Sequence, residues 1–189
     1  MSESIRSFLA FDIENELVTN RLMAAQSLLA QTGADLKIVE PKNIHITIRF
    51  LGDVSPPLVE KIFEIMKNVK FSAFEVRISG MGAFPDLRYP RVVWAGIASG
   101  ADQLKNIFSQ LEPHLQSSGF APDSKGFSPH LTIARVRSGK NRQQLGVSLS
   151  NNANYDFGIV KARCLRLKRS ILTPRGPIYS TLKEFCPPL

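Results

Sequence analysis

The feature that most constrains the fold is an internal repeat. His130 follows His45 by 130 − 45 = 85 positions, and each histidine opens an apolar stretch with a threonine two residues later. The same offset links further apolar positions: Phe8 with Val93, Leu22 with Ile107, and Phe74 with Ile159. Because one offset relates several elements, we interpret the chain as a duplication. The repeat is longer than a solenoid unit of about 20–50 residues.

Hydrophobic periodicity predicts the same order of elements in each half: strand, helix, histidine-bearing strand, helix, strand. The first half has these elements at 7–13, 16–31, 44–48, 58–69 and 74–79. The second half has them at 91–98, 101–116, 130–133, 142–149 (a weak helix) and 158–172. A final strand is expected at 178–185, outside the repeat.

These elements predict an α+β fold. We expect one domain, 1–189, made of two pseudo-two-fold-related lobes at about 1–85 and 86–175, with the final strand at 178–185 added. Each lobe would be an antiparallel sheet with its helices on the outside. The two lobes would face each other across a central groove.

Charge favours a polyanionic partner. The chain has 24 basic and 16 acidic residues, a formal net charge of +8. Such an excess attracts nucleic acid through phosphate contacts and counterion release. A basic composition can equally reflect the habits of the host, so charge alone does not define a site.

The two cysteines, Cys164 and Cys186, are too few for a disulfide framework and lack metal-ligand spacing. A reduced compartment therefore fits best. The apolar run Phe8–Phe11 is too short for a signal peptide or a membrane span. We expect a cytoplasmic monomer that needs no metal or cofactor.

The two histidine strands are the candidate catalytic elements. In a strand, residues i and i+2 share a face, so His45 lies beside Thr47 and His130 beside Thr132. A single histidine on a strand is usually structural, and a threonine there is ordinary composition. Two such pairs at matching positions favour function. His114, the third histidine, has no partner in the repeat.

Two facing imidazoles suit phosphodiester chemistry. Histidine titrates near neutral pH and can serve as a general base or a general acid. The threonine hydroxyls can hold phosphate oxygens. Opening a cyclic phosphate needs those groups and no metal.

The paired motifs resemble those of the 2H phosphoesterases, specifically the RNA 2′,3′-cyclic phosphodiesterases that are also called 2′-5′ RNA ligases. The resemblance covers nearly the whole chain: Arg6–Ala10, Asn43–Gly52, Gly82–Pro85, Pro90–Gly96, Phe127–Arg135, and Ser170–Gly176 with Tyr179. It implies hydrolysis of RNA 2′,3′-cyclic phosphate ends, with His45 protonating the 3′ oxygen and His130 activating water. The product would be a 2′-phosphate, and tRNA fragments are a candidate substrate. Because the two halves of the sequence are nearly equivalent, the residues alone do not say which histidine is the acid and which is the base.

Two arginines are rival phosphate ligands. Arg135 matches the family's arginine after the second motif, although strict alternation turns it away from His130 unless a bulge re-aims it. Arg49 lies on the catalytic face by simple counting. Either can instead be a solvated surface side chain.

The loop between the lobes offers possible RNA contacts. Phe84, Arg88, Tyr89 and Arg91 combine aromatic rings, which can stack on bases, with positive charge. An equally good interpretation is that the rings anchor the loop to the core.

Three other functions stay open at this stage. The reverse reaction would join tRNA half-molecules through a 2′-5′ linkage, because the same acid and base serve both directions. A non-catalytic RNA-binding module would use the basic groove alone. A small cyclic nucleotide could be the substrate. ATP-dependent ligation is disfavoured because the sequence has no GxxxxGK[ST] loop.

Overall fold

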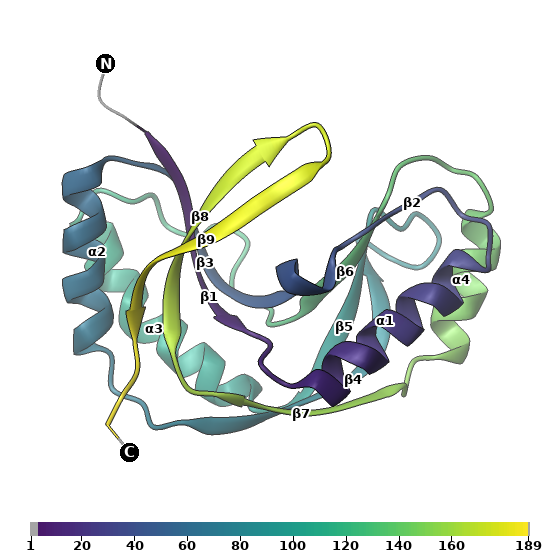
Figure 1. Ribbon diagram of the computed structural model, residues 1–189, viewed down its shortest axis with the longest axis horizontal. Coiled ribbons are helices and arrows are strands. Elements are labelled where there is room, and N and C mark those ends of the chain that lie inside the picture. The colour runs from purple at the N-terminus through teal and green to yellow at the C-terminus, as the bar shows by residue number, and fades with distance from the viewer. Residues whose placement is uncertain (1–3, 189) are drawn as a thin grey trace.

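The computed structural model describes residues 4–188; residues 1–3 and 189 of the expected domain lie outside this range. Its strands form one antiparallel sheet that curls strongly (Figure 1). The strands are β1 (Ile5–Asp12), β2 (Leu36–Ile38), β3 (His45–Val54), β4 (Phe74–Phe84), β5 (Val92–Ser99), β6 (Leu131–Val136), β7 (Asp156–Ala162), β8 (Leu165–Thr173) and β9 (Gly176–Phe185). The helices are α1 (Glu16–Ala30), the short 3-10 helix η1 (Pro41–Asn43), α2 (Pro56–Asn68), α3 (Ala101–Ser117) and α4 (Arg142–Asn151).

The sheet is joined at a narrow centre. Its order is β7-β4-β5-β6-β3-β1-β8-β9, with β2 paired to β6. At the centre, β3 and β6 meet through the register pair Ile46 and Leu131. Outward from that centre, β3 and β1 on one side correspond to β6 and β5 on the other. The strands related by the 85-residue offset therefore occupy matching places.

Two pairs of helices cover the two halves of the sheet. Figure 1 shows α2 and α3 together on one side of the molecule and α1 and α4 together on the other. Their apolar stripes are fully buried, as in α3, where Leu104, Ile107, Leu111 and Leu115 have no exposed surface. Burial of such a stripe supplies most of the stability of a helix in a protein.

The spatial halves differ from the expected lobes at 1–85 and 86–175. β4 comes from the first half of the sequence but lies between β5 and β7, whereas β8 and β9 come from the second half and lie beside β1. The predicted strand at 158–172 is two strands for the same reason. β7 pairs with β4, and after Cys164 the chain continues as β8, which pairs with β1. Each half of the sheet thus contains strands from both halves of the chain.

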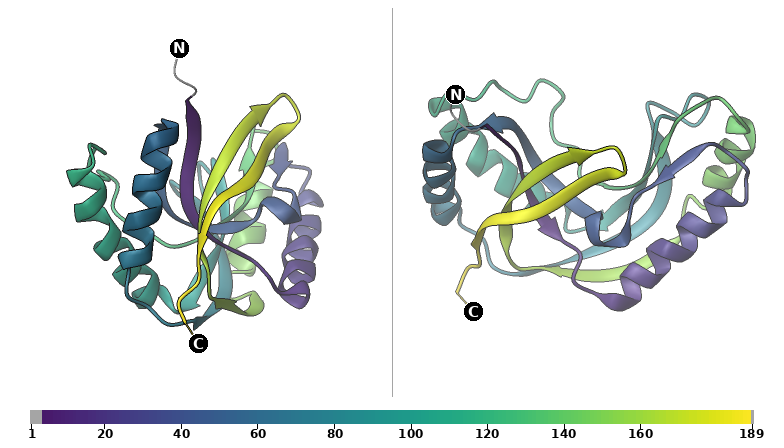
Figure 2. Two further views of the ribbon diagram at one scale, coloured as in Figure 1. Left: turned by 60° about the vertical axis from the view of Figure 1, so that its left-hand side comes forward. Right: turned by 45° about the horizontal axis from the view of Figure 1, so that its top comes forward.

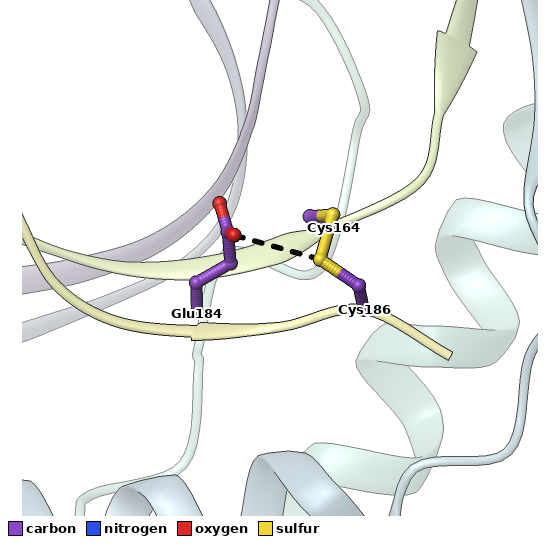
Figure 3. A group of neighbouring side chains, drawn as sticks. All are labelled: Cys164, Glu184 and Cys186. Carbon is purple, nitrogen blue, oxygen red and sulfur yellow. Dashed lines mark hydrogen bonds between the residues drawn. A yellow bond between two sulfur atoms is a disulfide. The ribbon is translucent and has the colours of Figure 1, made fainter. Parts of the chain in front are cut away.

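Cys164 and Cys186 form a disulfide at the base of the β8–β9 hairpin (Figure 3). This pairing departs from the expectation of reduced thiols. Leu165 lies opposite Phe185 in the β8–β9 register, so the next residues outward along the two strands are the two cysteines. The carboxylate of Glu184 lies 3.5 Å from the sulfur of Cys186. Because both sulfurs are bonded to each other, neither is a thiolate that could bind a metal.

Within residues 4–188, no helix has the length and apolar character needed to cross a membrane.

Candidate active site

β3 and β6 carry the two histidine–threonine pairs at the centre of the sheet. Ile46 and Ile48 are buried behind β3, while His45 and Thr47 keep partly exposed side chains on the opposite face. Thr132 is likewise partly exposed between the buried Leu131 and Ile133. The alternation predicted from the sequence therefore places each threonine on the open face of its strand.

A single cavity of about 470 Å³ is lined by all four of these side chains, His45, Thr47, His130 and Thr132. Arg135 and Tyr179 also line it. Its volume lies within the range of small-molecule sites. The structure thus brings together residues that are 85 positions apart in the sequence.

The two imidazoles are held in the same way. Nδ1 of His45 lies 2.7 Å from the backbone oxygen of Asn43, and Nδ1 of His130 lies 2.7 Å from the backbone oxygen of Ser128. A carbonyl oxygen only accepts hydrogen bonds, so in each ring Nδ1 carries the hydrogen. Nε2 is then the nitrogen that can gain or lose a proton at the cavity.

Aromatic rings support both histidines. The ring of Phe8 lies 4.8 Å from that of His45, and Tyr179 meets His45 edge-on at 5.4 Å. Phe84 meets His130 edge-on at 5.0 Å. These contacts restrict rotation of the imidazoles. Phe84 therefore packs against a histidine of the protein itself. This is nearer to the alternative in which its ring anchors the loop than to stacking on an RNA base.

Burial sets the charge state of His45 in the free protein. Removal from water lowers the pKa of His45 from 6.5 to about 4. The bond to Asn43 and the carboxylate of Asp12 oppose this shift, and the positive charges of Lys168 and His130 add to it. His45 is therefore neutral at pH 7, with a bare Nε2.

Tyr179 keeps its proton as well. Burial raises the pKa of Tyr179 above its usual value of 10, although the nearby charges of Arg135 and Arg6 work against the shift. Its hydroxyl is therefore a hydrogen-bond donor at every pH at which histidine titrates.

A β-bulge in each strand decides which arginine reaches the cavity. Arg135 follows a bulge in β6, where Trp94 pairs with Thr132 and Val93 with Ala134, so that Ile133 has no partner on β5. The extra residue reverses the alternation and returns Arg135 to the side of His130.

The equivalent bulge in β3 turns Arg49 the other way. Ala10 pairs with Thr47 and Leu9 with Arg49, which leaves Ile48 unpaired. Arg49 is buried and forms a salt bridge with Glu112 at 2.8 Å, so it does not line the cavity. The expectation that Arg49 lies on the catalytic face is therefore wrong, because counting by twos assumes an unbroken strand.

Comparison with known proteins identifies the family. The model of the LigT-like phosphoesterases matches the chain twice, at residues 13–94 and 96–179. The chain belongs to the LigT-like phosphoesterase family. The resemblance seen in the sequence is confirmed.

Relatives cover nearly the whole of this LigT-like phosphoesterase. An RNA 2′,3′-cyclic phosphodiesterase of Aeropyrum pernix is 41% identical over 88% of this chain and 95% of its own. One of Methanothermobacter thermautotrophicus is 34% identical over 96% and 98%. The crystal structure of Escherichia coli LigT with 3′-AMP has the same fold, with a TM-score of 0.80, 21% identity, and 97% and 98% coverage.

The other predicted RNA contacts of this LigT-like phosphoesterase are not among the residues that line the cavity. The backbone N–H groups of Arg88 and Tyr89 donate to Asp86, which shapes the loop after β4. The ring of Tyr89 lies 4.5 Å from the guanidinium of Arg142. Neither Arg88, Tyr89 nor Arg91 lines the cavity with the two histidines.

Sequence reasoning missed Tyr179 as a site residue. Tyr179 lies on β9, outside the repeat, so the offset that relates the two motifs gives no signal for it. It reaches His45 because β9 pairs with β8 and β8 with β1. Asn43 also ties β9 to the segment before β3, since its side chain donates to the backbone oxygen of Pro177 at 3.0 Å.

Proposed function

We propose that this protein is an RNA 2′,3′-cyclic phosphodiesterase that opens cyclic phosphate ends to 2′-phosphates, with His45 and His130 as its acid–base pair. The observation that carries the proposal is the convergence of two histidine–threonine pairs on one cavity, each imidazole oriented through Nδ1. The names of the relatives from Aeropyrum and Methanothermobacter support the same reaction.

The proposed step is an in-line displacement at phosphorus. One neutral imidazole accepts a proton from water through Nε2 as the water oxygen bonds to phosphorus. The bond from phosphorus to the 3′ oxygen breaks, and the other imidazole, protonated on Nε2, gives its proton to that oxygen. The product carries a 2′-phosphate and a free 3′-hydroxyl. Such paired proton transfers contribute about 10²–10⁴-fold per group.

The division of roles follows the family resemblance, with His45 as the acid and His130 as the base. The lowered pKa of His45 means that the free protein holds it neutral at pH 7. A bound cyclic phosphate brings a negative charge next to the ring and so favours the protonated imidazole. We therefore infer that His45 takes up its proton together with the substrate.

Thr47, Thr132 and Arg135 would hold the non-bridging phosphate oxygens. All three line the cavity with the imidazoles. Hydroxyl and guanidinium donors stabilise the charge that builds on those oxygens in the transition state. Among residues 4–188, the only candidate metal cluster contains the two disulfide-bonded cysteines, and none of its members lines this cavity.

RNA ends, including tRNA fragments, are the partners that we propose. The cavity opens among basic side chains, which suits a polyanionic strand. That the protein acts as a monomer in the cytoplasm stays a prediction, and the disulfide is unusual for a cytosolic protein.

The direct test uses an oligoribonucleotide with a 2′,3′-cyclic phosphate end. We expect a product with the 2′-phosphate, identified by ³¹P NMR. A longer strand formed with a second, 5′-hydroxyl oligonucleotide would instead support ligation. RNA binding without turnover would support the non-catalytic module. His45→Ala and His130→Ala should each lower kcat by about 10²–10⁴-fold, and full activity in both variants would overturn the proposal.

A further inference from the structure

The cavity carries more positive charge than one phosphate requires. Lys37, Arg137 and Arg175 line it in addition to Arg135. They come from three separate segments: Lys37 from β2, Arg137 from the residue directly after β6, and Arg175 from the turn between β8 and β9. The fold therefore gathers these cations around one space.

Register and packing hold the three segments together. Lys37 pairs with Arg135 across β2 and β6, which puts their side chains on the same face. Two positions further, the N–H of Arg137 donates to the backbone oxygen of Asp35 at 2.9 Å. The ammonium of Lys37 also reaches the hairpin turn, 3.9 Å from where a β-carbon on Gly176 would sit. Figure 1 shows the β8–β9 hairpin extending from its own half of the sheet toward β2.

In the part of the chain that the structure describes, these cations have no acidic partner. One carboxylate, Glu40, lines the cavity, and it pairs with Lys42 at 2.9 Å. Among residues 4–188, Lys37, Arg135, Arg137 and Arg175 form no salt bridge with any carboxylate. Like charges gathered around one cavity repel one another, and an anion in the cavity relieves the repulsion.

We propose that Lys37, Arg137 and Arg175 bind the phosphodiester that precedes the terminal cyclic phosphate of an RNA strand. This inference rests on the proposed function, in which Arg135 and the two threonines hold the reacting phosphate. The three remaining cations then face the next negative charge along the backbone. The protein should accordingly favour an oligonucleotide end over a mononucleoside 2′,3′-cyclic phosphate.

The test compares substrates that differ by one phosphate. We expect the wild-type protein to have a higher kcat/KM for a dinucleotide with a cyclic phosphate end than for the mononucleoside 2′,3′-cyclic phosphate. A dinucleotide with a neutral methylphosphonate linkage should lose that preference. The slope of log kcat/KM against log salt should be steeper for the charged dinucleotide, by about 0.7 for each phosphate neutralised in a single strand.

Variants assign the preference to the three side chains. Lys37→Ala, Arg137→Ala and Arg175→Ala should each lower kcat/KM for the charged dinucleotide by about tenfold, as expected for a charge-assisted phosphate contact. Their effect on the methylphosphonate dinucleotide should stay within about twofold. Lys105→Ala, which removes an exposed charge from α3, is the matched control and should change neither substrate.

Two other results would overturn the inference. Equal losses on the charged and neutral dinucleotides would place the three side chains at the reacting phosphate. No loss on either would remove them from substrate binding. A failure of the proposed function itself is distinguishable, because binding of a 3′-phosphorylated oligonucleotide by fluorescence anisotropy needs no turnover. The three variants should still weaken that binding by about tenfold, and unchanged binding would refute the second phosphate site.

Discussion

Ile48 in β3 and Ile133 in β6 occupy the same place in their strands: each is the extra residue of a β-bulge, and they are 133 − 48 = 85 positions apart. The bulges share one geometry but have different consequences. After Ile133, the second residue along is Arg135, which reaches the cavity. After Ile48, the second residue along is Phe50, and its ring lies 6.1 Å from that of Phe8. The duplicated scaffold therefore directs the residue at this position into the cavity as an arginine in β6 only, since the equivalent position in β3 is a phenylalanine.

The first prediction separates the two arginines. Arg135→Ala should lower kcat/KM by about 10²-fold, because it removes a donor to the charge that develops on phosphate, and should leave the melting temperature nearly unchanged. Arg49→Ala should instead destabilise the fold by roughly 3 kcal/mol, since it leaves the nearly buried Glu112 carboxylate with hydrogen bonds from Gln116 and Asp123 but without its positively charged partner. Urea unfolding and steady-state kinetics on both variants check this. A large kinetic loss in a stably folded Arg49→Ala protein would contradict the assignment.

The second prediction concerns the titration of His45. NMR of the ring protons should give His45 a pKa of about 4 in the free protein. Saturation with a nucleoside 2′-phosphate should raise this pKa, because the anion stabilises the imidazolium. His45→Asn assigns the resonance by removing it. A pKa near 6.5 in the free protein would show that the ring is well hydrated.

The third prediction follows from the same shift and concerns stability. The pKa of His45 is lower in the folded protein than the unfolded value of 6.5, so the unfolded chain binds the proton first as the pH falls. The contribution of His45 to the free energy of unfolding is constant above about pH 6.5, and it falls by roughly 3 kcal/mol as the pH approaches 4. His45→Asn should lose this part of the pH dependence, as measured by denaturant unfolding at a series of pH values. An identical pH dependence in both proteins would be the contrary result.

The fourth prediction tests the threonines with an isosteric change. Thr47→Val and Thr132→Val keep the β-branched shape that suits a strand but remove the hydroxyl donor. Each should lower kcat/KM by about tenfold, with little change in stability because both side chains are partly exposed. Thr181→Val, at an exposed position of β9, is the matched control. Wild-type kinetics in both variants would exclude the hydroxyls from the reaction.

The fifth prediction concerns the disulfide. Cys164→Ser combined with Cys186→Ser should lower the free energy of unfolding by about 3 kcal/mol, the value expected for a closed loop of this length. The sequence separation of the two cysteines is 22 residues. Thiol titration of the unfolded, unreduced wild-type protein should detect no free thiol. Two titratable thiols in that experiment would contradict the pairing.

Local patterns predicted most of the secondary structure. Each main helix begins within two residues of its predicted start, because its apolar residues recur at helical spacing before a polar or glycine end. β2 was missed because Leu36–Ile38 is too short to show a period, and it is a strand only through its pairing with β6. β4 runs past the expected break at Gly80 and Gly82 to Phe84, because this stretch pairs with β5. Gly82 is needed there for packing, since Trp94 leaves no room for a larger residue.

The candidate site was predictable to the extent that it repeats. The offset located His45, Thr47, His130 and Thr132 without any knowledge of the fold. Tyr179 and Arg175 lie in stretches that resemble the family's, but no role was assigned to them because neither belongs to the paired histidine–threonine motifs. Arg49 was misplaced because a bulge is a property of the paired strands and leaves no mark in the alternation of one strand.

The most direct test of the central claim is a crystal structure with a nucleoside vanadate, which mimics the five-coordinate transition state at phosphorus. The account predicts the vanadium between the two rings, with Nε2 of His45 and Nε2 of His130 each within about 2.6–3.2 Å of one apical oxygen. An anion that touches only one imidazole, or that binds elsewhere in the cavity, would contradict it.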